Sequence, residues 1–253
     1  MASGSFVNLL IFGKIFGLKS LALFYWKQWA LCNLPLLIPV FGVILHREEL
    51  LNIRDNILQG SIRDRDVERQ IRKARQPVIV DCGINVGVTV RWWFYLNPRA
   101  TVYGVDMMQE ANDFTLRALP GGFNGKYVPI TAVLASETGS VREIQYNDPL
   151  FGGNSVDATD KYSESRRVFS RTLDDCLRSY NIDTVDLLKV DIENSAADMF
   201  RGAVRTLSKA KNISLEIHSE REREDSVRLL SESGFCVKRS LKRHVWMERV
   251  SKK

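Results

Sequence analysis

The chain has 253 residues, a net charge of +6 and 45% hydrophobic residues, which is the composition of a folded protein with one large core and room for a small appendage. Its four cysteines form no CxxC pair, so we expect free thiols, a reducing compartment and a cytoplasmic location rather than a disulfide framework. Three histidines are too few for a histidine-rich metal cluster.

Residues 1–46 are strongly apolar, and the only charges after the first few positions are three lysines. Two prolines argue against a straight membrane-spanning helix, and no signal-peptide cleavage pattern follows the apolar block. We predict a helix over residues 5–31, followed by an extended segment. Two roles stay open for residues 1–46. The tryptophans Trp26 and Trp29 beside a lysine favour contact with the inner face of a membrane, and the alternative is packing against the main domain or a second copy.

Residues 48–75 are predicted to form one or more polar helices. Basic residues cluster there and again over residues 238–253, but aromatic residues are not interleaved with them. We therefore interpret both clusters as solvated surfaces and predict no nucleic-acid partner. The change in pattern near Pro77 divides the chain into an N-terminal apolar and helical extension, residues 1–76, and a main domain, residues 77–253.

The main domain alternates between strand-like and helix-like segments. Such alternation predicts an α/β fold with a doubly wound, mostly parallel, Rossmann-like sheet, because each crossover helix must bury its apolar face on the sheet. An antiparallel hairpin around Lys242 and Arg243 should close it, an ending typical of a methyltransferase sheet. The predicted strands are 77–83, 100–106, 127–134, 139–148, 185–192 and 212–218. One predicted helix follows the first strand and ends near residue 95, and three others cover residues 110–119, 171–181 and 196–210.

The stretch "VIVDCGINVG" joins the first predicted strand to the first helix, where doubly wound sheets commonly bind their ligands. Gly83 and Gly87 permit positive φ angles and a close approach to a ligand, and the helix N-terminus attracts an anion. For S-adenosylmethionine this anion is the methionine carboxylate. Asp81 can bind the amino group or hold the loop, and Asn85 can fix the turn. The dinucleotide fingerprint GxGxxG is absent, which disfavours a nicotinamide-dependent oxidoreductase.

Asp106 ends the second strand, where a carboxylate can accept hydrogen bonds from both ribose hydroxyls of a nucleoside cofactor. Ala132, near the end of the third strand, completes the predicted cofactor-binding set. A solvated aspartate at a strand end is the alternative reading of Asp106 taken alone.

Four further polar residues end the two strands that follow in the sheet: Asp191, Glu193, Glu216 and His218. They should face the same crevice as residues 83–87, which are called the cofactor loop below. There they can remove a proton from a hydroxyl or hold a divalent ion. We predict Asp191, His218 and Glu193 as the catalytic group and predict no metal ligand, although a divalent ion is compatible with the pattern. Carboxylates that only cap the next helix are the alternative.

Together these motifs resemble the FkbM-type methyltransferases, a class I family that depends on S-adenosylmethionine and mostly methylates oxygen. The resemblance runs from about Pro77 to Val237. It is carried, in order, by "VIVDCGINVG", "VYGVD", "AVLASETGSV", "GGNSV", "RTLDDCL", "VDLLKVDIENSAADMFRGA" and "SLEIH". In this family a glycine usually follows the position of Glu193 and a further acid comes soon after, whereas this chain has Asn194 and Ala197. The usual Glu-Pro after the second strand is Asp106-Met107.

The resemblance implies a methyl transfer from S-adenosylmethionine to a hydroxyl of a sugar, a glycolipid or a small metabolite. A binding or assembly protein that keeps the sheet without turnover stays open as an alternative, because of Asn194 and Ala197.

Overall fold

The computed structural model describes residues 37–38, 42–43, 46–58, 60–119, 125–156 and 162–250. The helix predicted over residues 5–31 lies outside these ranges. Two short strands, β1 (Leu37–Ile38) and β2 (Gly42–Val43), pair antiparallel. The polar helices predicted over residues 48–75 are α4 (Arg47–Asn52), the π-helical turn η1 (Ile53–Leu58) and α5 (Arg65–Lys73).

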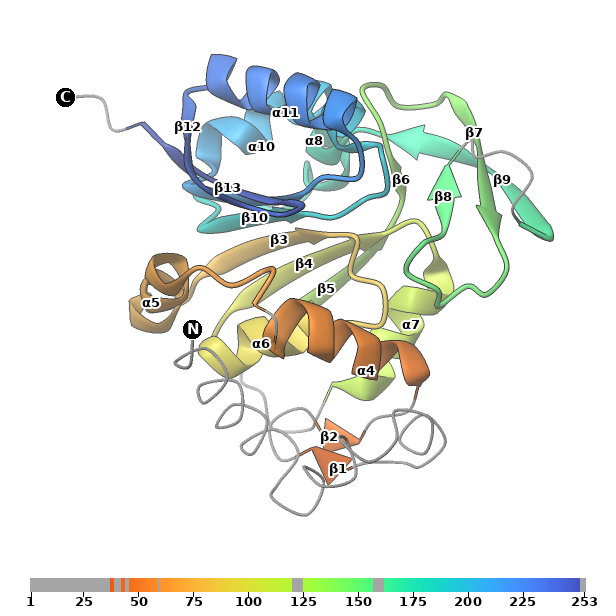
Figure 1. Ribbon diagram of the computed structural model, residues 1–253, viewed down its shortest axis with the longest axis horizontal. Coiled ribbons are helices and arrows are strands. Elements are labelled where there is room, and N and C mark those ends of the chain that lie inside the picture. The colour runs from red at the N-terminus through yellow and green to blue at the C-terminus, as the bar shows by residue number, and fades with distance from the viewer. Residues whose placement is uncertain are drawn as a thin grey trace.

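A seven-stranded sheet forms the centre of the molecule, in the order β12-β13-β11-β10-β3-β4-β5 (Figure 1). The pairs between β11, β10, β3, β4 and β5 are parallel, whereas β13 runs antiparallel to both of its neighbours. The predicted doubly wound sheet with a closing hairpin is thus confirmed. Its strands are β3 (Val78–Cys82), β4 (Thr101–Asp106), β5 (Lys126–Thr131), β10 (Leu187–Val190), β11 (Asn212–Glu216), β12 (Phe235–Leu241) and β13 (His244–Arg249).

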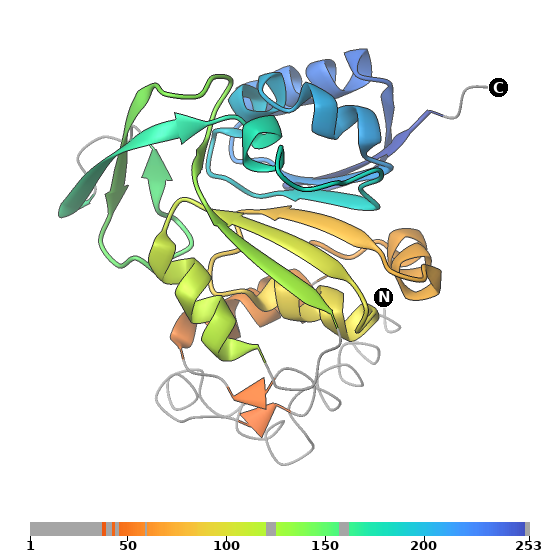
Figure 2. The same ribbon diagram turned by 180° about the vertical axis from the view of Figure 1, so that it is seen from behind.

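Helices cover both faces of this sheet (Figures 1 and 2). One face carries α4, α5, α6 (Val88–Leu96) and α7 (Gln109–Ala118). The other carries α8 (Leu173–Cys176), α10 (Val204–Lys209) and α11 (Glu220–Glu232), and α9 (Ala196–Arg201) packs on α11. Buried isoleucines from the segment before Pro77, among them Ile53, Ile57 and Ile71, share one core with Trp92 and Phe94 of α6. The described part of the N-terminal extension is therefore packed into the main domain.

A second sheet projects from one end of the central sheet (Figure 2). Its order is β6-β9-β7-β8. The strand predicted over residues 127–134 is divided at Ala132, so that its last residues leave β5 and join this second sheet. The strands are β6 (Val133–Leu134), β7 (Val141–Tyr146), β8 (Ser155–Val156) and β9 (Glu164–Arg171).

Other features also differ from the sequence-based expectation. Strands β8 and β9 and helix α11 are additional elements, and the helix predicted over residues 171–181 is the shorter α8. The helix predicted over residues 196–210 is two helices separated at Gly202, where a side chain would meet the carbonyl oxygen of Ala135. Among the described cysteines, Cys82, Cys176 and Cys236 are free thiols. No helix in the described part of the chain is long and apolar enough to cross a bilayer.

Candidate functional site

The loop between β3 and α6 has three residues in the left-handed region: Gly83 at φ 80°, Asn85 at φ 49° and Gly87 at φ 68°. A Cβ on Gly83 would lie 1.7 Å from the carbonyl oxygen of Asp191, and one on Gly87 would lie 2.5 Å from the Thr115 side chain. Glycine is therefore required at both positions, because it adopts the positive φ angle and has no side chain that would clash. Asn85 tolerates the left-handed conformation better than most residues.

Asp81 is fully buried near the end of β3. Its Oδ2 accepts a hydrogen bond of 2.8 Å from Trp93 Nε1, and its Oδ1 lies 3.2 Å from Lys189 Nζ. Lys189 in turn donates to the Gly83 carbonyl at 2.5 Å. Of the two roles considered for Asp81, these contacts favour holding the loop, because the carboxylate is already paired on both oxygens.

Asp106 binds two loops, the one that follows β3 and the one that follows β4. Its Oδ2 accepts from the Asn85 backbone N–H and its Oδ1 from the Met108 backbone N–H, both at 2.9 Å. Burial raises the pKa of Asp106 to about 6, against the lowering effect of the two N–H donors and of Lys189. Each carboxylate oxygen keeps a second lone pair, so the group can still accept ribose hydroxyls.

A cavity of about 340 Å³ opens beyond the strand ends and includes both halves of the predicted site. Volumes of this order are typical of small-molecule sites. Gly152, in the loop between β7 and β8, packs so closely on the Asn85 side chain that a Cβ there would lie 2.8 Å from Nδ2. That loop therefore closes over the cofactor loop. Predicted site residues that line the cavity are Gly83, Asn85, Asp106, Ala132, Asp191, Glu193 and His218; Asp81 and Gly87 lie behind it.

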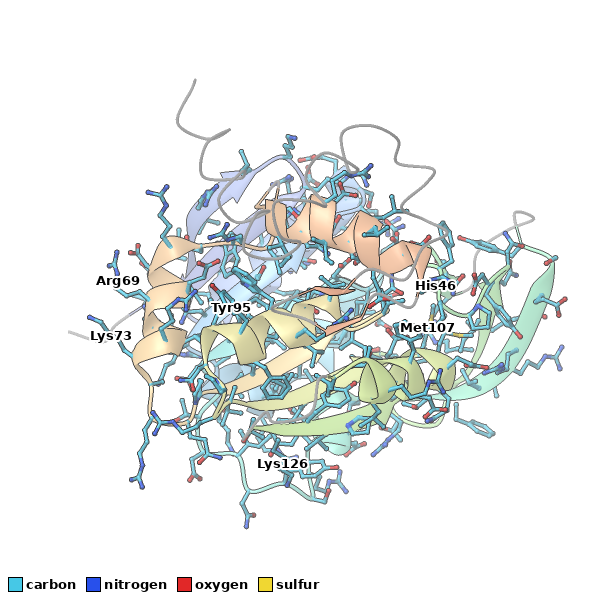
Figure 3. The ribbon with its side chains drawn as sticks, turned by 90° about the horizontal axis from the view of Figure 1, so that it is seen from below. His46, Arg69, Lys73, Tyr95, Met107 and Lys126 are labelled. Carbon is cyan, nitrogen blue, oxygen red and sulfur yellow. The ribbon has the colours of Figure 1, made fainter. Side chains whose placement is uncertain are left out.

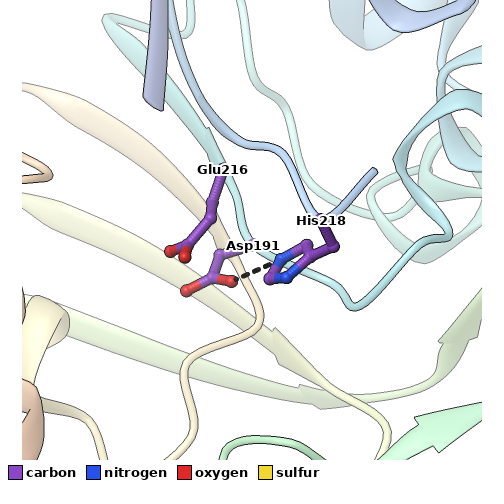
Figure 4. A group of neighbouring side chains, drawn as sticks. All are labelled: Asp191, Glu216 and His218. Atoms are coloured by element: carbon purple, nitrogen blue, oxygen red, sulfur yellow. Dashed lines mark ion pairs between the residues drawn. The ribbon is translucent and has the colours of Figure 1, made fainter. Parts of the chain in front are cut away.

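The catalytic candidates form a connected charged cluster, of which Figure 4 draws Asp191 and His218. His218 Nε2 lies 3.4 Å from Asp191 Oδ1, and His218 Nδ1 lies 3.0 Å from Glu193 Oε2. Burial lowers the pKa of His218, but Asp191 and Glu193 raise it by more, to about 9. The imidazole is therefore protonated at neutral pH, which weighs against His218 as the proton acceptor.

The two carboxylates of this cluster differ in basicity. Burial raises the pKa of Asp191, but Lys189, 3.5 Å away, and His218 lower it by more, to about 2. Burial raises the pKa of Glu193, His218 opposes the rise, and the neighbouring carboxylates add to it. Because its side chain is 30% exposed to the cavity, Glu193 is the accessible base of the group.

Glu216, the fourth polar residue predicted here, lies beside the cluster (Figure 4). Its Oε2 is 3.1 Å from His244 Nε2. One ligand atom each from Asp191, Glu216 and His218 lie within 4.8 Å of one another, so the arrangement is compatible with a divalent ion. Lys189 and the His218 imidazolium already bring two positive charges to the same carboxylates.

Asn194 and Ala197 differ from the residues that the family usually has at these positions, and the structure shows what surrounds each of them. Asn194 has φ 55°, a left-handed position that glycine normally fills and that asparagine can also adopt. Near Ala197, where the further acid is missing, buried Glu222 of α11 accepts from the Ala196 backbone N–H at 3.2 Å and from the His218 backbone N–H at 2.8 Å. A carboxylate from another helix thus lies at the start of α9.

Several residues of the site were not predicted from the sequence. Lys189, which pairs with Asp81 and Asp191 but does not line the cavity, lies within a predicted apolar strand, and its charge was the available signal. Residues from α4 and η1 also line the cavity, and no local sequence motif indicated a site there. Arg243, predicted only as a hairpin residue, reaches the cavity as well.

The sequence and structure were compared with known proteins. The family model of the FkbM methyltransferase domain matches residues 81–240. No curated protein matches the chain. Among solved structures, fibrillarin from Aeropyrum pernix with bound S-adenosyl-L-methionine is 14% identical, with a TM-score of 0.42 over 75% of this chain and 76% of that chain. A putative rRNA methylase from Clostridium thermocellum is 11% identical, with a TM-score of 0.43 over 74% of this chain and 96% of that chain.

Proposed function

The chain belongs to the FkbM methyltransferase family, and from that premise we propose that it transfers a methyl group from S-adenosylmethionine to a hydroxyl oxygen of a sugar, a glycolipid or a small metabolite. The observation that carries the proposal is one shared cavity: the cofactor loop and the Asp191–His218–Glu193 cluster both line it. The two reactants can therefore meet without a large rearrangement, and their positioning supplies much of the acceleration.

The side of the cavity next to β3, β4 and β5 would hold S-adenosylmethionine. Gly83 and Asn85, near the N-terminus of α6, would hold its methionine end, and Asp106 would accept hydrogen bonds from its ribose hydroxyls. Met107, Met108 and Ala132 would contact its adenine. Support for this placement comes from the residues that line the cavity there and from the positive φ angles of Gly83, Asn85 and Gly87 in the loop after β3.

The acceptor enters on the side of β10 and β11. Its hydroxyl oxygen attacks the methyl carbon, the carbon–sulfur bond breaks with its electron pair going to sulfur, and the hydroxyl proton passes to the Glu193 carboxylate. Protonated His218 holds Glu193 and Asp191 in place through its two ring nitrogens. Glu193 takes the role of base because its pKa is raised, whereas that of Asp191 is lowered to about 2.

Calorimetry with S-adenosylmethionine, S-adenosylhomocysteine and NAD side by side tests the cofactor part of the proposal. We expect both sulfur compounds to bind and NAD to give no heat. Tight binding of NAD alone would contradict it. Transfer of a labelled methyl group to a panel of sugars, glycolipids and small hydroxyl compounds then identifies the acceptor class, and label on nitrogen or carbon in every product would refute O-methylation.

With an acceptor in hand, Glu193→Gln tests the base. Methyl transfer should fall by about 10²–10⁴-fold, while S-adenosylhomocysteine affinity stays within a few-fold of wild type. Asp191→Asn and His218→Ala should also reduce transfer, because His218 positions Glu193 and Asp191 positions His218. Near-normal turnover in all three variants would show that the proton leaves by another route. Turnover in chelator and with added Mg²⁺ decides whether a metal takes part.

For residues 1–46 we propose attachment, either to the surface of a membrane or to a second copy of the chain. The support is the apolar sequence with two tryptophans beside a lysine. Removal of residues 1–45, which keeps the His46 cap of α4, should abolish flotation with anionic vesicles while leaving cofactor affinity unchanged. Equal flotation of both forms would refute the membrane version, and loss of a dimer in light scattering would favour the second.

A further inference from the structure

Residues 46–58, which comprise α4 and η1 and are called the N-terminal wall below, form one side of the cavity. Six of them line it: Glu48, Leu51, Asn52, Arg54, Asp55 and Asn56. All of them precede the region that matches the FkbM domain, which begins at residue 81. π-Helical turns such as η1 are rare and frequently occur at functional sites. The wall is thus part of the site although the family pattern does not include it.

A buried ion pair connects this wall to the helix that follows the cofactor loop. Glu49 Oε1 lies 2.6 Å from Arg91 Nη2, and the two side chains are 0% and 1% exposed. The second oxygen of Glu49 accepts from the His46 backbone N–H at 2.7 Å, which closes the capping box of α4. One carboxylate therefore fixes the start of α4 and binds Arg91.

Arg91 continues the connection to the cofactor loop itself. Its Nη2 donates to the Val86 carbonyl and its Nε to the Gly87 carbonyl, each at 3.3 Å. Both carbonyls belong to the turn that contains the left-handed Gly87. Because a buried guanidinium without its counter-ion is strongly unfavourable, Arg91 can keep this position only while Glu49 is in place.

The rest of the wall is held at both of its ends. Ile53 and Ile57 are buried in the core beside α6. At the other end, the His46 ring packs edge-on against Phe114 of α7, and its Nε2 lies 3.8 Å from Asp148. Figure 3 shows α4 on the face of the sheet that carries α6 and α7, with His46 at one end of α4. The wall therefore spans α6 and α7, the helices that follow the two cofactor-binding strands.

We propose that the Glu49–Arg91 pair couples the N-terminal wall to the cofactor loop, so that the loop binds the cofactor tightly only when the wall is seated. Glu49 and Arg91 are positioning residues, acting through the Val86 and Gly87 carbonyls. The proposal rests on the proposed cofactor site. Linkage makes the coupling reciprocal: cofactor binding must stabilise the seated wall as much as the seated wall favours binding.

The test uses the full chain and S-adenosylhomocysteine as the probe. Glu49→Gln and Arg91→Lys should each weaken its binding in calorimetry by roughly tenfold or more, measured well below the melting temperature of each variant. Arg91→Lys separates the two roles of Arg91, since an ammonium keeps the charge pair with Glu49 but cannot also reach both loop carbonyls. A purely structural ion pair predicts that Arg91→Lys keeps wild-type affinity, and that result would overturn the proposal.

The matched control is Glu68→Gln. Glu68 belongs to α5, is buried, and binds Arg63 at 2.8 Å, yet it does not line the cavity or contact the cofactor loop. Its substitution should lower stability and leave S-adenosylhomocysteine affinity unchanged. An equal loss of affinity in Glu68→Gln would show that any buried charge change has this effect and would overturn the coupling.

Hydrogen exchange on the unmodified chain gives a test that needs no variant. Addition of S-adenosylhomocysteine should slow exchange at residues 47–58 together with residues 83–87. Protection confined to residues 83–87 would overturn the coupling while leaving the cofactor site intact. Failure of the wild-type chain to bind the probe would instead refute the proposed cofactor site, so the two failures are distinguishable.

Discussion

At the scale of single residues, backbone conformation explains why glycine and asparagine alternate after β3. The residues at 83, 85 and 87 all have positive φ angles, and Asn194, where the family usually has glycine, has one as well. The spacing of Gly83, Asn85 and Gly87 was visible in the sequence, and so was the turn it encodes. The contact between Gly83 and the Asp191 carbonyl was not, because it joins two strands that are more than a hundred residues apart.

Gly83→Ala should abolish measurable S-adenosylhomocysteine binding and lower the melting temperature. The new Cβ would lie 1.7 Å from the Asp191 carbonyl oxygen, so either the loop or the end of β10 must move. Gly139→Ala is the matched control, because Gly139 also has a positive φ, of 100°, but has open space around it. It should cost only the strain of about 1–2 kcal/mol in unfolding free energy and keep wild-type affinity. Equal affinities in the two variants would contradict the packing argument.

Cofactor affinity should depend on pH through Asp106, whose pKa burial raises to about 6. Ribose hydroxyls bind the ionised carboxylate, so affinity for S-adenosylhomocysteine should be constant well above pH 6 and weaken as pH falls through that value. The limiting slope is about tenfold per pH unit. Asp106→Asn should bind more weakly at pH 8 and show a flat profile between about pH 5 and 7. Calorimetry at four pH values measures both profiles, and parallel profiles would rule out Asp106 as the titrating group.

At the scale of helices and strands, hydrophobic patterns were informative where an element is buried and uninformative where it is not. The central parallel strands are mostly buried, and each was predicted, although the strand predicted over residues 127–134 is divided at Ala132. Strand β9, "ESRRVFSR", and helix α11, which begins "EREREDS", are rich in charge and half exposed, so neither has the apolar period that identifies its type. The missed helix matters for the site, because α11 supplies Glu222.

Glu222→Gln should disturb the junction of α9, β11 and α11. The carboxylate accepts backbone N–H groups from Ala196 and His218, and a glutamine can offer only one oxygen to the two donors. The free energy of unfolding, measured with urea, should fall by about 1.5–3 kcal/mol. Glu224→Gln, an exposed change on the same helix, is the control and should stay within about 0.5 kcal/mol of wild type. If the unfolding free energy of Glu222→Gln also stays within about 0.5 kcal/mol of wild type, Glu222 does not stabilise the junction of α9, β11 and α11.

At the scale of the whole molecule, the sheet and its order follow from the alternation of elements, while the wall of the cavity follows from long-range packing. Pro77 marked a change in sequence pattern and was predicted as a domain boundary. The core nevertheless extends across it, since Ile53 and Ile57 pack with residues of α6. Charged pairs also join distant segments: Glu49 with Arg91 across Pro77, and, within the main domain, Asp81 with Lys189 and Asp191 with His218. Sequence patterns identified the strand ends, but only the fold shows which charges neutralise each other.

The stability of the whole chain should therefore fall on the alkaline side of neutrality, before lysines begin to lose their protons. The pKa of His218 is raised from 6.5 to about 9 in the folded protein, so the folded state binds this proton more tightly than the unfolded state. Its contribution is complete below about pH 6.5 and is lost as pH rises through about 9, with a limiting slope of about 1.4 kcal/mol per pH unit. Urea unfolding at intervals between pH 6 and 9.5 measures this slope. His218→Gln removes the titrating group, so the variant should be less stable at pH 6.5 and show a flatter profile, approaching wild type near pH 9. Parallel curves for the two proteins would mean that the Asp191–His218–Glu193 cluster does not hold its proton in the folded state, and the assignment of Glu193 as the base would fall with it.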